Sequence, residues 1–316
     1  MSTLPPEFWS LPLANNSLTV SDKITTTVET TQFVLFCLTL SIYSIEVWAL
    51  LEAQKRRVEE LSSPFFKLCL STAGIDIWTL LTNYFGAMFP KWGWFVPVYL
   101  VLGNPYGRIY LYFAWSAGIC QAMGVSVLAS NRLSVMLFPT SFHRLWQGYR
   151  LWIAIGIQYL TGLAIGIATF FNEVQLFRNG KNGIVPKFLN VKMTNAFFAI
   201  GGVFLLVNCI YLVLTYCYLF WVIHKRQKTM RVQHPPRSKS KERAKTREAR
   251  LFTMSTIIVG VQLVILLLFI FKGADILAFT TDQFYLVYNA TSDLYASINP
   301  YLLWTNISLL SHQSHL

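Results

Sequence analysis

Residues 224–250 have the sequence HKRQKTMRVQHPPRSKSKERAKTREAR, and this polar stretch decides how the whole chain is organised. It contains eleven Lys or Arg residues and two acids, Glu242 and Glu248, so it carries +9 of the chain's net charge of +12. Long apolar runs without charged residues flank it on both sides. Because basic residues accumulate in cytoplasmic loops, we interpret residues 224–250 as the largest cytoplasmic loop of a membrane protein.

The composition supports this interpretation. The chain has 316 residues, of which 54% are hydrophobic and 13% are charged, whereas about 25% are charged in a soluble domain. A strongly basic chain could bind nucleic acid. Here the positive charge is concentrated in one loop between apolar runs, so membrane topology explains it and we expect no nucleic-acid partner.

Seven apolar segments are long enough to cross a bilayer, which takes about 20 residues of α-helix. They are residues 31–51, 68–89, 109–130, 151–171, 194–223, 251–271 and 284–310. These runs are much longer than the roughly 10 residues of a barrel strand. The sequence therefore predicts an all-α, integral membrane bundle of seven transmembrane helices over residues 31–310. Residues 1–30 would form an extracellular tail, residues 92–102 an interfacial part of the first outer loop, and residues 311–316 a short cytoplasmic tail.

The orientation follows from the distribution of basic residues. With the amino terminus outside, the inner loops hold seventeen Lys or Arg residues and the outer segments hold seven. This bias predicts an outer amino terminus and an inner carboxyl terminus. Asn15 then lies outside in an Asn-x-Ser triplet and is a candidate glycosylation site.

Three acids fall within the predicted spans, namely Glu46, Asp76 and Asp293. A charge at the centre of the bilayer costs at least ~2.5–3.5 kcal/mol, so each acid should face the interior of the bundle. Asp76 shares a helical face with Asn83, and Asp293 lies on a similar polar face with Asn289. Together with Asn299 these residues could form a hydrated network that switches or holds a cation. Alternatively, they could only hydrogen-bond one helix to another.

The inner ends of two spans carry short motifs. The third span ends in Ser130-Asn131-Arg132-Leu133-Ser134, followed by Phe138-Pro139 and Trp146, and the seventh contains Asn299-Pro300-Tyr301. Seven spans with these two motifs resemble the G-protein-coupled receptors. The Asn-Arg-Leu-Ser form is similar to that of the nematode serpentine chemoreceptors, most nearly class gamma, with class v as the near alternative.

The resemblance implies a chemosensory receptor of the plasma membrane, including that of a sensory cilium, without enzymatic activity, cofactor or metal. It implies an unknown small-molecule or peptide ligand and a heterotrimeric G protein as partners. Arg132 would contact the G protein or pair with Glu248, although it could also be an interfacial arginine that snorkels. Asn131 departs from the broad receptor pattern, which has an acid there. Pro300 would act as a switch or as a static kink.

Candidate ligand contacts are chosen by their depth in the spans, because pockets in helical bundles form between helices. They are Asn83, Tyr84, Tyr110, Phe113, Phe197, Phe198, Phe269, Tyr285, Tyr288 and Asn289. Each of them could instead be a packing residue. A transporter or channel remains the alternative class, although the sequence shows neither the internal repeat nor the charged pore rings expected of one.

Overall fold

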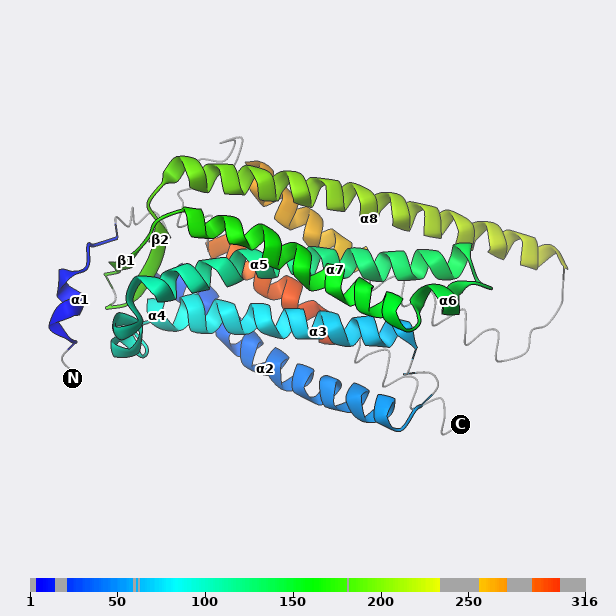
Figure 1. Ribbon diagram of the computed structural model, residues 1–316, viewed down its shortest axis with the longest axis horizontal. Coiled ribbons are helices and arrows are strands. Elements are labelled where there is room, and N and C mark those ends of the chain that lie inside the picture. Colours follow the sequence, from blue (N-terminus) through cyan, green and yellow to red (C-terminus); the bar gives the residue numbers. More distant parts are fainter. Residues whose placement is uncertain are drawn as a thin grey trace.

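The computed structural model describes residues 4–14, 22–58, 61, 63–180, 182–233, 256–271 and 286–301. These residues form a bundle of long helices with a small β-hairpin at one end (Figure 1). We call that end the hairpin end, and the opposite end the α6 end. The basic residues 234–250, the tail 311–316, Asn15, Glu248 and Tyr285 lie outside the described residues.

The helices follow one another in a simple order. They are α1 (Pro6–Ser10), α2 (Asp22–Lys55), α3 (Pro64–Asn83), the π-helix η1 (Tyr84–Met88), α4 (Phe89–Lys91), α5 (Val96–Leu137), α6 (Phe142–Trp146), α7 (Tyr149–Gly166), the 3-10 helix η2 (Ile167–Phe171) and α8 (Val191–Gln233). Two further helices cover Thr256–Phe271 and residues 286–301. Each of the seven predicted spans thus contains helix, and five of the helices are long and apolar enough to cross a membrane. The protein is an all-α membrane helix bundle.

The helices extend beyond the predicted spans. Helix α5 has 42 residues, or about 63 Å at 1.5 Å per residue, and a bilayer core measures about 30 Å. Its first turns, residues 96–102, were predicted to be part of an outer loop and are helical instead. They are separated from the rest of α5 by Gly103, whose φ of 58° breaks the helical geometry and favours glycine. Helix α2 likewise starts at Asp22, inside the predicted tail.

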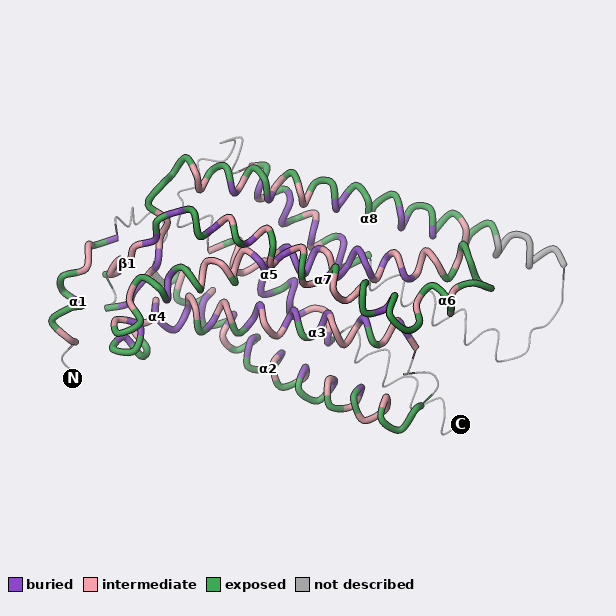
Figure 2. Tube along the Cα trace, viewed as in Figure 1, coloured by how far each residue is buried: buried purple, intermediate pink, exposed green. Residues whose placement is uncertain are grey.

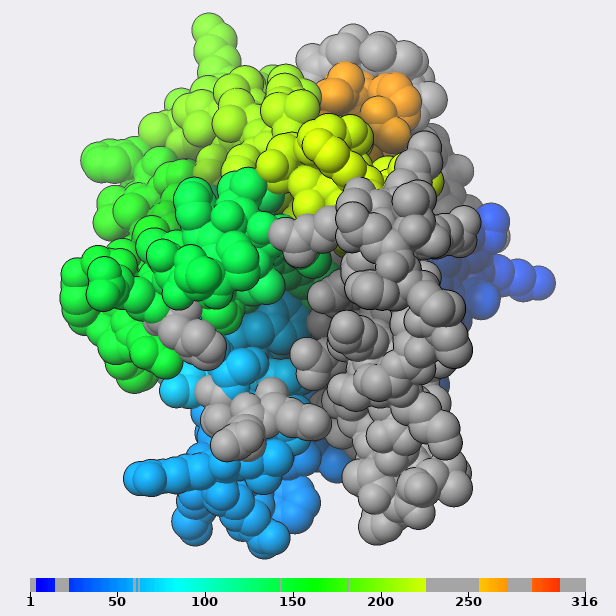
Figure 3. Space-filling model, turned by 90° about the vertical axis from the view of Figure 1, so that its right-hand side faces the viewer, coloured from blue at the N-terminus to red at the C-terminus, as the bar shows by residue number. Residues whose placement is uncertain are grey.

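Helix α5 is the central element of the bundle. It packs against α3, α7 and α8, and it is the most buried of the long helices, whereas the outward faces of α2 and α8 are largely exposed (Figure 2). Figure 3 looks onto the α6 end, where α3, α7, α8 and Thr256–Phe271 emerge in turn around the bundle. Exposed apolar faces are what a bundle presents to lipid.

Helices α5 and α7 approach each other closely through a small-xxx-small motif, Gly162 and Gly166 of α7. A Cβ atom built on Gly162 would lie 2.4 Å from the Ser116 carbonyl oxygen and 2.4 Å from the Cys120 sulfur. One built on Gly166 would lie 2.0 Å from the Ser116 hydroxyl. Small residues at this spacing let two membrane helices pack backbone against backbone.

The hairpin was not predicted from the sequence. Strands β1 (Val174–Arg178) and β2 (Ile184–Phe188) pair antiparallel between α7 and α8. The amino-terminal segment joins them, because Leu13 bridges to Arg178 and the Ala14 amide donates to the Arg178 carbonyl at 2.8 Å. Phe8 of α1 is 1% exposed and packs among residues of the hairpin and of α5. The amino-terminal segment and the hairpin therefore form one cap on the bundle.

Candidate functional site

An aromatic cluster lies between four helices in the half of the bundle nearer the hairpin. Trp115 of α5 meets Phe198 of α8 edge-on, with ring centroids 5.2 Å apart, and Phe197 at 6.1 Å. Phe198 in turn packs against Phe269 at 5.6 Å, and Phe269 against Tyr288 at 5.7 Å. The structure thus brings four of the predicted ligand contacts together around Trp115, which the sequence analysis missed.

Glycines allow these rings to reach one another. A Cβ atom at Gly201 would lie 3.3 Å from the Trp115 ring and 3.6 Å from the Phe269 ring. A Cβ atom at Gly118 would lie 3.6 Å from the Tyr288 hydroxyl. The cluster also reaches the hairpin, because the Phe188 ring of β2 lies 5.9 Å from that of Phe197.

Asp293 lies one helical turn after Asn289 in the last helix, where it contacts α3 and η1. It is 6% exposed. Its carboxylate accepts a hydrogen bond from the Asn83 amide at 2.9 Å and one from the Tyr84 hydroxyl at 3.3 Å. Tyr84 also stacks on Phe36 of α2, with centroids 3.9 Å apart. Asn83 and Tyr84 were predicted as ligand contacts. In the structure they are instead hydrogen-bond donors to the buried Asp293 carboxylate.

Two other candidates lie elsewhere. The Tyr110 ring packs against the backbone of Gly86 and beside Tyr106, in the core of the cap. Phe113 is 36% exposed and meets Trp78 edge-on at 5.5 Å on the outer surface of the bundle. Neither side chain joins the aromatic cluster. The prediction chose them by depth alone, and depth does not determine which face of a helix a residue occupies.

Asp76 is the centre of a second polar group, deeper in the bundle. Its carboxylate accepts hydrogen bonds from the Tyr43 hydroxyl at 2.8 Å, the Gln121 amide at 2.8 Å and the Asn299 amide at 2.7 Å. These donors belong to α2, α5 and the helix over residues 286–301. Asp76 is 1% exposed, and the third predicted acid, Glu46, is 2% exposed on α2. Asp76 therefore connects four helices through one carboxylate.

A chain of uncharged side chains forms a third polar group, which the sequence analysis did not identify. The Asn208 amide of α8 donates to the Ser126 hydroxyl of α5 at 2.8 Å. The Gln262 amide donates to the Asn208 carbonyl oxygen at 2.6 Å, and the Tyr295 hydroxyl donates to the Gln262 carbonyl oxygen at 3.2 Å. We call these four residues the amide relay. It links α5, α8 and both later helices inside the membrane.

Arg132 lies near the α6 end of α5, where its guanidinium carbon stands 4.9 Å above the centre of the Phe65 ring at the start of α3. This cation–π contact gives Arg132 an aromatic partner, whereas the broad receptor pattern has an acid next to the arginine. Asn131 beside it is 1% exposed. Nearby, the Trp146 indole of α6 donates to the Ser134 hydroxyl at 2.6 Å. Pro300 is buried, and its helix continues through it to residue 301.

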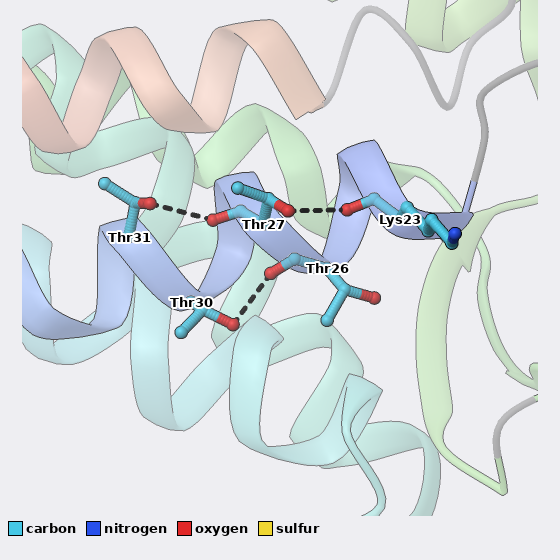
Figure 4. Close-up of a pocket in the computed structure, with 5 residues that line it drawn as sticks. All are labelled: Lys23, Thr26, Thr27, Thr30 and Thr31. Carbon is cyan, nitrogen blue, oxygen red and sulfur yellow. Dashed lines mark hydrogen bonds between the residues drawn. The ribbon is translucent and has the colours of Figure 1, made fainter.

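A shallow surface depression lies along the first turns of α2. It is lined by Lys23, Thr26, Thr27, Thr30 and Thr31 (Figure 4). The hydroxyls of Thr27, Thr30 and Thr31 donate to carbonyl oxygens one turn earlier in the same helix. Three of its four hydroxyls are thus directed to their own backbone, and the depression is no convergent binding site. Within the described part of the chain, no group of His, Cys, Asp and Glu has the arrangement of a metal site.

The structure places Asp76 in α3, Arg132 near the α6 end of α5 and Asn299-Pro300 in the last helix, which is the arrangement that the resemblance to G-protein-coupled receptors implies. The family model described as serpentine type 7TM GPCR chemoreceptor Srv matches residues 32–313, and the chain belongs to this family. No curated protein sequence matches the chain.

The family match decides several predictions. The protein is a seven-transmembrane chemosensory receptor and a multi-pass membrane protein, and its family is one of receptors rather than enzymes. The predicted serpentine chemoreceptor relationship is confirmed. The matching model is that of class v, which was the near alternative, so the preference for class gamma is not supported. A transporter or channel is not favoured.

Proposed function

We propose that the receptor binds a small-molecule or peptide ligand at the aromatic cluster and passes the change to a heterotrimeric G protein at the α6 end. The observation that carries this proposal is the contact of four helices through Trp115, Phe198, Phe269 and Tyr288. A ligand that separates or bridges these rings would change the relative positions of the helices. Ligand pockets in bundles are formed in this way, by apolar side chains from several helices.

The amide relay offers a route from this site towards the α6 end. Gln262 lies two turns before Phe269 in the same helix, and Asn208 lies two turns after Gly201 in α8. A displacement of Phe269 would therefore act on a helix whose Gln262 is held by Asn208 and Tyr295. Buried polar groups must stay hydrogen-bonded. Such a network therefore switches between distinct hydrogen-bonded arrangements and does not shift continuously.

The cytoplasmic contact in this proposal is Arg132, which the Phe65 ring holds in the present arrangement. Release of the guanidinium from Phe65 would make it available to the G protein. This contact replaces the acidic partner that the broad receptor pattern places beside the arginine. Pairing of Arg132 with Glu248 remains a prediction, because Glu248 lies outside the described residues.

Substitution of Arg132 by alanine tests this proposal. Cells expressing the receptor would be screened for ligand-evoked calcium or cyclic-nucleotide signals. We expect Arg132→Ala to reduce the potency of any active ligand by roughly tenfold or more, because a central interface arginine contributes about 2 kcal/mol. Arg144→Ala, an exposed arginine on α6, is the matched control. Equal signalling by both variants at equal surface expression would refute the role of Arg132.

The proposed orientation places the hairpin end outside the cell and the α6 end in the cytoplasm of the plasma membrane, including that of a sensory cilium. Residues 224–250 would then contact the G protein or anionic lipid, as their charge predicts. The transmembrane domain would comprise residues 31–310.

Glycosylation of Asn15 tests the orientation. We expect one glycan, removed by Asn15→Gln and visible as a single shift on a gel after glycosidase treatment. Asn306→Gln is the control, because its triplet lies in the predicted seventh span and should stay unmodified. A glycan that survives in Asn15→Gln would contradict this topology.

A further inference from the structure

The first turns of α5, residues 96–102, expose an apolar face beside α4 at the hairpin end (Figure 1). On one side of these turns Val96 and Tyr99 are buried and pack on the cap. The opposite side carries four apolar side chains that are between 51% and 88% exposed, namely Phe95, Val98, Val101 and Leu102. We call these four residues the apolar ridge. An exposed apolar surface of this kind marks contact with a membrane or a partner.

Two residues in the left-handed conformation set this segment apart from the chain on either side. Gly103 has a φ of 58° and separates it from the rest of α5, and Phe95 has a φ of 56° and precedes its first turn. A bulky residue is rarely found in this conformation, which favours glycine. The Phe95 side chain is 61% exposed, so packing within the protein does not explain why phenylalanine stands there. Contact of the ring with lipid does explain it.

The depth of the segment follows from its contact with η1. The Tyr99 hydroxyl donates to the Phe85 carbonyl oxygen at 2.6 Å. Phe85 lies twenty residues after Phe65 in the continuous helical run of α3 and η1, which corresponds to a rise of about 30 Å. The hydrocarbon core of a bilayer has about this thickness. With Phe65 and Arg132 at one boundary of the core, Phe85 and Tyr99 lie at the other.

The apolar ridge also continues the lipid-facing surface of the bundle. The Phe85 side chain is 53% exposed, and Leu81, one helical turn earlier on α3, is exposed as well. Trp94 is exposed immediately before the ridge, and tryptophan is enriched at the boundary between lipid and water. The sequence has no charged residue between Lys91 and Arg108. The ridge therefore offers a partner only apolar contact, which suits lipid chains.

We propose that the apolar ridge is a membrane-docking surface that inserts into the boundary between headgroups and lipid chains at the hairpin end. This is the outer leaflet in the orientation proposed above. Interfacial helices bury one apolar face in this boundary. Here the opposite face carries the cap, so the docked ridge holds the cap at a fixed depth on the membrane. The inference goes beyond the proposed function, because it involves neither a ligand nor a G protein.

A nitroxide spin label at position 101 measures this depth directly. The label would be attached to Val101→Cys in the full chain carrying Cys37→Ala and Cys217→Ala, since these two native cysteines are exposed. The receptor would be reconstituted in phosphatidylcholine vesicles, and relaxation of the label by oxygen, which is enriched in lipid, would be compared with relaxation by a water-soluble nickel chelate. We expect the ratio of oxygen to nickel collisions to be severalfold higher at position 101 than in Leu13→Cys, whose label lies on the exposed surface of the cap.

Two results of this measurement would overturn the proposal. An equal ratio at positions 101 and 13 would show that the ridge faces water. Low access of both oxygen and nickel at position 101, together with dipolar broadening between labels, would show that a second copy of the chain covers the ridge instead of lipid.

Aspartate substitutions test the same surface without a label. In lipid nanodiscs we expect Val101→Asp to lower Tm and Leu13→Asp to leave it unchanged, because a carboxylate is costly where lipid surrounds it. Val203→Asp, on the exposed face of α8 within the predicted fifth span, should lower Tm further. If Val101→Asp were as stable as Leu13→Asp, position 101 would lie in water and the proposal would be wrong.

The outcomes separate this inference from the proposed function. A receptor whose ridge lies in lipid but whose signalling does not depend on Arg132 keeps the docking surface and loses the proposed coupling. A receptor whose ridge faces water but whose signalling depends on Arg132 keeps the coupling and loses the docking surface.

Discussion

Asp76→Leu is expected to destabilise the receptor severely. Leucine has a similarly branched side chain, but it leaves the Gln121 and Asn299 amides without their acceptor inside the bundle, whereas the Tyr43 hydroxyl keeps the Ala296 carbonyl oxygen at 2.8 Å. Each of these two unsatisfied buried donors costs about 1–3 kcal/mol, so we expect a loss of about 2 kcal/mol or more. Thermal unfolding in detergent and surface expression in cells measure the effect.

Two other variants on α3 bracket this result. Asp76→Asn keeps one acceptor oxygen and should fall between the wild type and Asp76→Leu. Leu81→Ile changes an exposed residue of the same helix and should leave Tm unchanged. If Asp76→Leu were as stable as Leu81→Ile, the Gln121 and Asn299 amides would have other partners and Asp76 would not hold these helices together.

Gly162→Ala is expected to destabilise the receptor, although alanine usually stabilises a helix relative to glycine by roughly 0.5–1 kcal/mol. The added Cβ would lie 2.4 Å from the Ser116 carbonyl oxygen and 2.9 Å from the Cys120 amide nitrogen. These are backbone atoms, so α5 and α7 must move apart. Overpacking of this kind costs about 1–3 kcal/mol, and Gly162→Leu should cost more.

The control is Gly156→Ala, in the same helix. The nearest heavy atom to a Cβ at Gly156 is the Leu160 Cδ1 at 3.8 Å, which is ordinary contact. Gly156→Ala should therefore be neutral or stabilising, so the two substitutions are expected to have opposite signs in the same Tm measurement. The same sign for both would show that α5 and α7 are not held at this distance.

Much of the fold could be predicted from hydropathy, because a helix that crosses lipid needs a long apolar run and the chain contains seven. Hydropathy does not specify how each helix is rotated. The sequence analysis expected that Asp76, Asp293 and Asn299 could form one polar network, and the structure pairs Asp76 with Asn299 and Asn83 with Asp293. That prediction was feasible because each acid lies at helical spacing from other polar residues of its own helix.

The amide relay had no comparable signal. Asn208 and Gln262 are single polar residues in apolar runs, and each has a partner on a different helix. Trp115 was missed for the same reason, since an aromatic residue in a span can equally face lipid, as Phe113 does. The hairpin was missed because its strands have five residues each and β2 contains Pro186.

The cap formed by the amino-terminal segment and the hairpin makes the start of the chain part of the folded receptor. The Arg178 amide donates to the Pro12 carbonyl oxygen, the Arg178 carbonyl accepts from the Ala14 amide, and the guanidinium carbon lies 5.4 Å from the centre of the Trp9 ring. The cap packs on Tyr99 of α5, whose hydroxyl donates to the Phe85 carbonyl oxygen of η1 at 2.6 Å. Residues far apart in the sequence are therefore expected to unfold as one cooperative unit, so that shortening the amino terminus would also loosen the hairpin.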